Sequence, residues 1–145
     1  MEETPQDRVF RIPHLRRLIL YYKVKEERKI RTNEDVCVAV RRWFDDRDKA
    51  ERCYGHISEW DVTRVTDMRY LFTKNNEELR AKEDRGEGFD RGGVQRATDF
   101  DEDISRWQTA NVTNMRGMFA GASLFNGDLS QWNTANVTDM SSVFR

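Results

Sequence analysis

Apolar and polar positions recur along this chain with a period of 25 residues. Residues 100–119 read FDEDISRWQTANVTNMRGMF and residues 125–144 read FNGDLSQWNTANVTDMSSVF, and 11 of the 20 aligned pairs are identical. A related segment, ISEWDVTRVTDMRYLF at 57–72, matches residues 104–119 at 8 of 16 positions. We call these segments copy 1 (57–72), copy 2 (100–119) and copy 3 (125–144). A repeat of this period predicts structural units that stack on one another.

Each copy combines two patterns of apolar residues. The stretches DISRW and DLSQW alternate apolar and polar positions, which is typical of a very short strand. The stretch VTNMRGMF predicts a short helix, because its apolar residues fall on one helical face. In copy 2 and the residues directly after it, this face consists of Val112, Met115, Met118, Phe119 and Ala122. The predicted fold class is therefore α/β, a short solenoid of about three 25-residue strand-plus-helix repeats.

Neither element of a copy can bury its apolar face alone, so successive copies are expected to pack together. The tryptophans at equivalent positions, Trp60, Trp107 and Trp132, are predicted to stack as a ladder inside the protein. The equivalent methionines and phenylalanines predict parallel ladders beside the tryptophans. The solenoid is predicted to span residues 57–145.

A short amphipathic helix is predicted in a basic N-terminal arm, residues 1–31. Pro13 suits the first turn of a helix, and the apolar residues that follow have helical spacing. These residues are Leu15, Leu18, Ile19 and Tyr22.

A helical cap is predicted for residues 32–56. Thr32 or Asn33 can cap a helix that runs from Val36 to Phe44, and Gly55 is a suitable C-terminal stop. The segment DDRD at 45–48 either interrupts this helix or begins another turn.

Copies 1 and 2 are separated by an insertion. Trp60 lies 47 residues before Trp107, which is one period plus 22 residues. The extra residues fall in 73–99, where 13 of 27 residues are charged and four are glycine. Such a segment buries too little apolar area to offset its ordering entropy, so an inserted loop is predicted.

Composition favours one small globular domain. The chain has 145 residues, of which 37% are hydrophobic, and no apolar run approaches the roughly 18 residues of a membrane helix. The first residues lack an apolar signal segment, so we expect an intracellular protein, in the cytoplasm or an organelle, without a secretion signal or membrane span. Cys37 and Cys53 have no metal-ligand spacing and are expected to be buried reduced thiols, with a disulfide between them as the alternative.

The charge of the chain is asymmetric. Residues 8–31 hold nine Lys and Arg against two Glu, whereas the whole chain has a net charge of −1. This segment is either a solvated helix face or a binding arm for an acidic protein, RNA or an anionic lipid surface. The candidate partner-binding residues of the arm are Arg16, Arg17, Lys23 and Lys25.

The repeat motif resembles that of the BspA-like leucine-rich-repeat family, which reads approximately F-N-x-D-(I/L)-S-x-W-(D/N)-(T/V)-(S/A)-x-V-T-x-M-x-x-M-F. The preceding VRRWFDDRDKAERCYGHISEW is similar to the segment before the first repeat in members from eukaryotic algae and other protists. The resemblance implies a solenoid used as an interaction surface, with no catalytic residues. This chain departs from the family in having only three copies and an insertion among them.

The remaining motifs favour structural roles over chemistry. His56 and Ser58 lie together without a well-placed acid, and the acidic stretches DED (101–103) and NGD (126–128) offer too few oxygen ligands for calcium. We therefore expect no enzyme activity, cofactor, metal or small-molecule substrate. The predicted function is a non-catalytic protein–protein interaction or scaffold module, an accessory or structural subunit of a larger assembly; the alternative is a nucleic-acid-associated protein that binds through residues 8–31.

The outer side of copy 3 is the second candidate binding surface. A further unit would cover its apolar residues, and without one they form an apolar edge beside an unpaired backbone at 129–132. We expect a partner chain or the insertion 73–99 to cover this edge. Its residues are Trp132, Val137, Met140, Val143 and Phe144.

Overall fold

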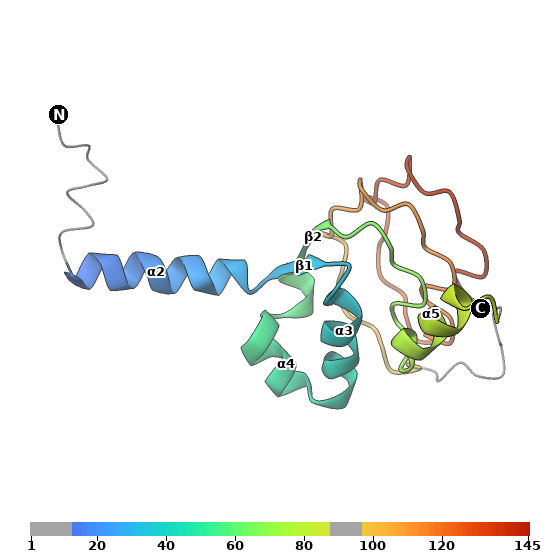
Figure 1. Ribbon diagram of the computed structural model, residues 1–145, viewed down its shortest axis with the longest axis horizontal. Helices are drawn as coiled ribbons and strands as arrows, with labels where there is room; N and C mark the ends of the chain where they lie inside the picture. Colours follow the sequence, from blue (N-terminus) through green and yellow to red (C-terminus); the bar gives the residue numbers. More distant parts are fainter. Residues whose placement is uncertain (1–12, 88–96) are drawn as a thin grey trace.

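The structure, a computed structural model, describes residues 13–87 and 97–145 of the protein. It combines several helices with a small two-stranded parallel sheet, which agrees with the predicted α/β class at that level. Figure 1 shows α2 projecting from one end as an arm, α3 and α4 in the middle, and the repeat copies with α5 at the other end. In chain order the elements are α2 (Pro13–Glu27), β1 (Ile30–Thr32), α3 (Val36–Asp45), α4 (Arg47–Tyr54), the 3-10 turn η1 (Ile57–Glu59), β2 (Asp61–Arg64) and α5 (Asn76–Asp84).

The predicted amphipathic helix is present as α2, which begins at Pro13. None of its residues is buried, because the helix projects away from the body (Figure 1). Six of its large apolar side chains are between 38% and 62% exposed. They are Leu18, Ile19, Leu20, Tyr21, Tyr22 and Val24. Residues 1–12 of the predicted arm lie outside the described residues.

Two helices, α3 and α4, lie in the region predicted as a helical cap. The α3 helix begins after Asp35 rather than after Thr32 or Asn33, because Thr32 belongs to β1 and its N–H donates to the Asp35 carboxylate at 2.8 Å. Asp46 separates the helices and caps α4 by accepting from the Lys49 N–H. Gly55 ends α4 with a φ of +77°, as the stop signal predicted.

Strand β1, which pairs in parallel with β2, was not predicted from the sequence. Its central residue, Arg31, is only 3% exposed. The guanidinium lies over the rings of Tyr54 and Trp60, 4.6 and 5.4 Å from their centroids, and pairs with Asp35 at 2.7 Å. A buried, paired arginine thus lies at the join between the cap and copy 1.

The predicted strand-plus-helix content of the copies is wrong, because copy 1 contains the strand β2 but no α-helix, and copies 2 and 3 contain neither element. The segments DISRW and VTNMRGMF form turns and irregular backbone. Within the described residues their strand pairing is limited to isolated parallel bridges from Asn114 to Asp67 and to Asp139. The chain cannot continue as a helix because Tyr70, Gly117 and Ser142, which occupy one repeat position, have φ values of 54–59°. Instead of bonding along a helix, alternate N–H groups of one copy donate to the next copy.

Part of the insertion is ordered, contrary to the prediction of a loop throughout 73–99. The α5 helix packs against α3, and Asn76 and Leu79 are buried. The Asn76 amide donates to the carbonyls of Cys37 and Leu71, both at 3.1 Å. These hydrogen bonds hold the start of α5 on α3 and copy 1. Residues 88–96 of the insertion lie outside the described residues.

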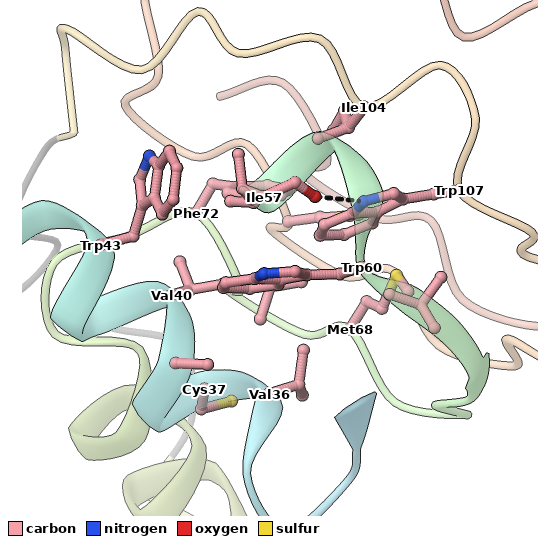
Figure 2. Packing of buried hydrophobic residues seen from close by; sticks show 14 of the residues in the cluster. Val36, Cys37, Val40, Trp43, Ile57, Trp60, Met68, Phe72, Ile104 and Trp107 are labelled. Atoms are coloured by element: carbon pink, nitrogen blue, oxygen red, sulfur yellow. Dashed lines mark hydrogen bonds between the residues drawn. The ribbon is translucent and has the colours of Figure 1, made fainter. Parts of the chain in front are cut away.

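The predicted tryptophan ladder is confirmed. The Trp60 and Trp107 rings are 6.2 Å apart with an interplanar angle of 15°, and the Trp107 and Trp132 rings are 6.4 Å apart at 1°. Figure 2 shows Trp60 and Trp107 lying one above the other among side chains of α3 and copy 1. The phenylalanines stack as well, with Phe119 5.1 Å from Phe72 and 5.5 Å from Phe144.

The two cysteines are free thiols, so the disulfide alternative is wrong. Cys37 is buried as predicted, and burial raises the pKa of its thiol to about 11. Cys53 is exposed, contrary to the prediction, because it lies on the outer face of α4.

Candidate interaction surface

Copies are joined by a pattern of backbone hydrogen bonds that occurs twice. In copy 1, three alternate N–H groups donate to copy 2, and the equivalent three groups of copy 2 donate to copy 3, all at 2.8 or 2.9 Å. Because the donors are two residues apart, they form one parallel edge along each copy. The donor and acceptor pairs are Met68 to Asn114, Tyr70 to Arg116, Phe72 to Met118, Met115 to Asp139, Gly117 to Ser141, and Phe119 to Val143.

A second set of bonds runs in the opposite direction, from each later copy to the earlier one. The indole N–H of Trp107 donates to the Ile57 carbonyl at 2.9 Å (Figure 2), and that of Trp132 donates to the Ile104 carbonyl at 3.1 Å. The Asn111 amide likewise donates to the Thr63 carbonyl. In copy 3 the Asn136 amide donates to the Ala110 carbonyl, and the Thr138 N–H donates to the Thr113 carbonyl. Repeat residues therefore serve as hydrogen-bond partners of the preceding copy.

The apolar ladders become exposed at copy 3. Met68 and Met115 are buried, whereas the equivalent Met140 is 47% exposed. In the same way Phe72 and Phe119 are buried, whereas Phe144 is 67% exposed. The described part of the insertion therefore does not cover this side of copy 3.

We call this side the open edge. It brings together the five predicted side chains of copy 3, of which Trp132, Val137 and Val143 are half-buried against the core. The N–H groups of Met140, Ser142 and Phe144 also lie on it, because they are equivalent to the donors of copy 2. Among the described residues none of these three N–H groups has an acceptor.

The predicted basic residues lie on α2, away from the open edge. Lys23 lies 3.8 Å from Glu27, and both side chains are exposed. No other ion pair from Arg16, Arg17, Lys23 or Lys25 to a residue within 13–87 or 97–145 is present. Figure 1 places α2 and the copies at opposite ends of the molecule, so the two candidate surfaces are distinct.

An ion-pair cluster that was missed in the sequence holds α5 on the copies. Arg69 pairs with Asp67 at 2.9 Å and with Glu83 at 2.9 Å, and Arg80 donates to the Asp67 carbonyl at 2.7 Å. Glu83 also pairs with Arg116 of copy 2 at 3.2 Å. Burial alone would raise the pKa of Asp67, but hydrogen bonds from Arg69 and the charge of Arg80 hold it below its usual range. The alternating charges of the insertion are the sequence signal for this cluster, but they do not identify the partners.

The His56 and Ser58 pair has a local structural role. The two side chains lie 2.8 Å apart, and the His56 ring caps η1 by accepting from the Ser58 N–H. The Glu102 carboxylate lies 3.9 Å from the other ring nitrogen, a partner that the sequence did not reveal. Glu102 itself pairs with Arg47 at 2.8 Å. This cluster joins α4, η1 and the start of copy 2.

The candidate calcium residues also take part in turns. Asp103 accepts from the Ser105 N–H, and Asp128 accepts from the Ser130 N–H. Asp101 accepts from the Asn126 N–H at 3.1 Å. Within 13–87 and 97–145 no group of three or more acidic, His or Cys side chains has the arrangement of a metal site.

A family model described as "Mycoplasma protein of unknown function, DUF285" matches residues 38–82 and 91–145, which is more than half of the chain. The chain belongs to this family. The DUF285 match includes all three copies and most of the helical cap, in agreement with BspA-like repeats, while the algal and protist type stays a prediction. No curated protein and no solved structure matches the chain significantly. Within residues 13–87 and 97–145, every helix of this DUF285 member is too short or too polar to span a membrane.

Proposed function

We propose that this DUF285 protein is a non-catalytic protein–protein interaction module, built as a short solenoid, that acts as an accessory or structural subunit of a larger assembly. The observation that carries the proposal is the open edge. Met140 and Phe144 are exposed there, although their equivalents in copies 1 and 2 are buried. Exposed apolar side chains that continue an interior ladder are typical of a surface that another polypeptide covers.

The polar groups of the copies support a role in binding rather than in chemistry. Repeat asparagines and tryptophans donate to the preceding copy, and repeat aspartates hold turns. Each of these side chains is therefore used to build the stack. The surface that remains for function is the stack itself, and solenoids use such extended surfaces for binding.

Size-exclusion chromatography of extracts from the source cells tests this proposal. An assembly subunit is expected to elute well above the 17.3 kDa of the chain. A Met140→Asp/Phe144→Asp double variant is expected to shift to the mass of the free chain, because charges at the open edge oppose desolvation. Tyr21→Asp is the matched control, since Tyr21 is a similarly exposed aromatic residue on α2. Elution of the wild-type chain at its own mass would contradict the proposal.

A second candidate function, nucleic-acid binding through residues 8–31, is favoured by the exposed basic side chains of α2. Clustered lysines and arginines bind phosphate by releasing counterions, so the affinity for RNA or DNA would fall steeply with salt. The Arg16→Ala/Arg17→Ala/Lys23→Ala/Lys25→Ala variant should weaken binding and reduce the salt slope. Binding that is independent of salt or unchanged in this variant would dismiss this candidate.

A further inference from the structure

The helix α2 carries most of the exposed apolar surface of the described chain. Six of the nine large apolar side chains that are exposed among the described residues lie on this helix, and none of its residues is buried. An isolated helix of about 12–15 residues is only marginally stable in water, because helices in proteins are stabilised mainly by packing. Exposed apolar area of this extent marks an interaction site. We therefore expect α2 to be packed against a partner when the protein acts.

The apolar side chains of α2 lie on two opposite sides of the helix. Face A consists of Leu15, Leu18, Ile19 and Tyr22, and face B consists of Leu20, Tyr21 and Val24. Residues three and four positions apart share a side of a helix, which unites the members of each face. Leu20 and Val24 each lie two residues from Tyr22, a rotation of about 200° around the helix axis. A partner that buries this surface must therefore contact α2 from both sides.

Basic side chains lie along the borders between the two faces. Arg16 and Lys23, which are two turns apart, lie along one border, and Lys25 lies along the other. Face B forms a shallow hollow at the foot of the helix, lined by the apolar Leu20, Tyr21 and Val24 and the basic Arg17, Lys25 and Arg28. Arg28 is held there because its Nη1 donates to the Arg52 carbonyl of α4 at 3.0 Å. Apolar surface beside cations is complementary to apolar side chains flanked by carboxylates.

We propose that α2 is an anchor helix for a partner protein with an apolar groove, whose two walls cover faces A and B and whose rims carry acidic side chains. The inference rests on the interaction role proposed above but uses a surface separate from the open edge. Insertion of a helix into an apolar groove is an established mode of recognition, and complementary charges fix its register. The acidic residues of α2, Glu26 and Glu27, are its last two residues, so they leave the borders basic over the preceding turns.

Other occupants do not match both faces and the charges. A lipid surface covers only one side of a helix, as does a single segment of the same chain laid along α2. Nucleic acid phosphates pair with basic side chains but leave the apolar side chains in water. Two copies of α2 packed through face A would bring their basic borders together, so like charges would meet. A groove with acidic rims satisfies the two apolar faces and the cations together.

Isothermal titration calorimetry of the 145-residue chain with calmodulin tests the inference. Calmodulin is an acidic probe whose apolar grooves bind helices and open only with calcium, so we expect saturable binding that a calcium chelator abolishes. Ile19→Glu on face A and Leu20→Glu on face B should each weaken binding at least about tenfold, because each places a charge on a covered apolar face while glutamate preserves helix propensity. Leu124→Glu is the matched control, since Leu124 is an exposed leucine outside α2, and it should leave binding unchanged.

The acidic rims are tested by the salt dependence of the same titration. Binding should weaken as salt screens the border cations. The Arg16→Gln/Lys23→Gln variant should bind more weakly than the wild type and depend less on salt. An unchanged salt profile in this variant would overturn the assignment of acidic rims.

Absence of binding to calcium-loaded calmodulin would overturn the inference, as would weakening by only one of the two face variants. Tighter binding to vesicles of equimolar phosphatidylcholine and phosphatidylserine, tighter binding to an RNA oligonucleotide, or dimerisation of the chain that Ile19→Glu abolishes would also overturn it. A melting temperature of the free chain that falls with Ile19→Glu or Leu20→Glu but not with Leu124→Glu would show that the chain itself already covers α2. If calmodulin fails to bind while the chain elutes from extracts in a large assembly, this inference is wrong and the proposed function stands.

Discussion

Truncation of Trp107 to alanine is expected to remove a large part of the stability of the domain. Its ring is 2% exposed and lies between Trp60 and Trp132, and its indole N–H donates to the Ile57 carbonyl at 2.9 Å. Removal of a buried tryptophan side chain costs about 3–5 kcal/mol, and the hydrogen bond adds about 1 kcal/mol. The expected loss of about 4–6 kcal/mol compares with a total stability of about 5–15 kcal/mol for a typical domain.

Urea unfolding followed by far-UV circular dichroism measures this loss, and Trp132→Ala is the matched comparison. Trp132 makes the equivalent hydrogen bond but is only half-buried, with a tryptophan on one face alone. We therefore expect Trp132→Ala to cost about half as much, on the order of 2–3 kcal/mol. The reasoning is refuted if Trp107→Ala costs no more than Trp132→Ala, or no more than Glu87→Ala in the exposed insertion.

Three further variants or probes test single features of the structure. Gly117→Ala should lower the melting temperature more than Gly86→Ala. Both glycines have positive φ, but a Cβ at 117 would lie 2.5 Å from the Tyr70 ring, whereas a Cβ at 86 would meet nothing within 4 Å. Equal effects of the two variants would contradict this packing. Asp67→Asn should keep the turn, since Asn114 makes the same turn in copy 2, but lose the ion pairs with Arg69 and Arg80. The pKa of Asp67 is lowered on folding, so the stabilisation by its carboxylate is present above about pH 4 and is lost as the pH falls through the pKa of the folded state. The Asp67→Asn variant should therefore lose less stability between pH 6 and pH 3 than the wild type does. An unchanged pH profile of stability would show that the ion pairs of Asp67 contribute nothing. A thiol reagent at pH 8 should label Cys53 rapidly and Cys37 only after unfolding, because the Cys37 thiol is buried and has a pKa of about 11. Rapid labelling of both cysteines would contradict the burial of Cys37.

The ladder positions could be predicted from the sequence because they depend only on the repeat period. Trp60, Trp107 and Trp132 stack as their spacing indicates, and the aromatic and methionine positions of copies 1 and 2 are buried. The side chains of the open edge were predictable for the same reason. Equivalent residues must lie side by side in any structure that stacks the copies, whatever the local backbone is.

The backbone of the copies could not be predicted in this way. Apolar spacing in VTNMRGMF fits a helix, but the left-handed conformation at Tyr70, Gly117 and Ser142 breaks it in every copy. Only one of these three residues is a glycine, so the pattern of residue types does not mark the position. Hydrogen bonds between copies stabilise this conformation, and they form only when the units are stacked.

Two ordered elements depend on partners that are distant in sequence. The β1 strand lies in a basic stretch, and it is held by the burial of Arg31 between Tyr54 and Trp60. The α5 helix lies in the charged insertion, and it is held by Asn76 on α3 and by Arg69 of copy 1. Local composition favoured a loop in the insertion and did not indicate a strand at 30–32, and the tertiary contacts outweighed it.

Amide hydrogen exchange on the free 145-residue chain tests most directly the claim that copy 3 ends in an open edge built like the interior of the stack. The N–H groups of Met115, Gly117 and Phe119 donate to copy 3 and should exchange slowly, at rates set by opening of the stack. The equivalent groups of Met140, Ser142 and Phe144 should exchange orders of magnitude faster, because they have no acceptor in the described structure. Equal protection of the two sets would contradict the account, since the edge would then already be occupied.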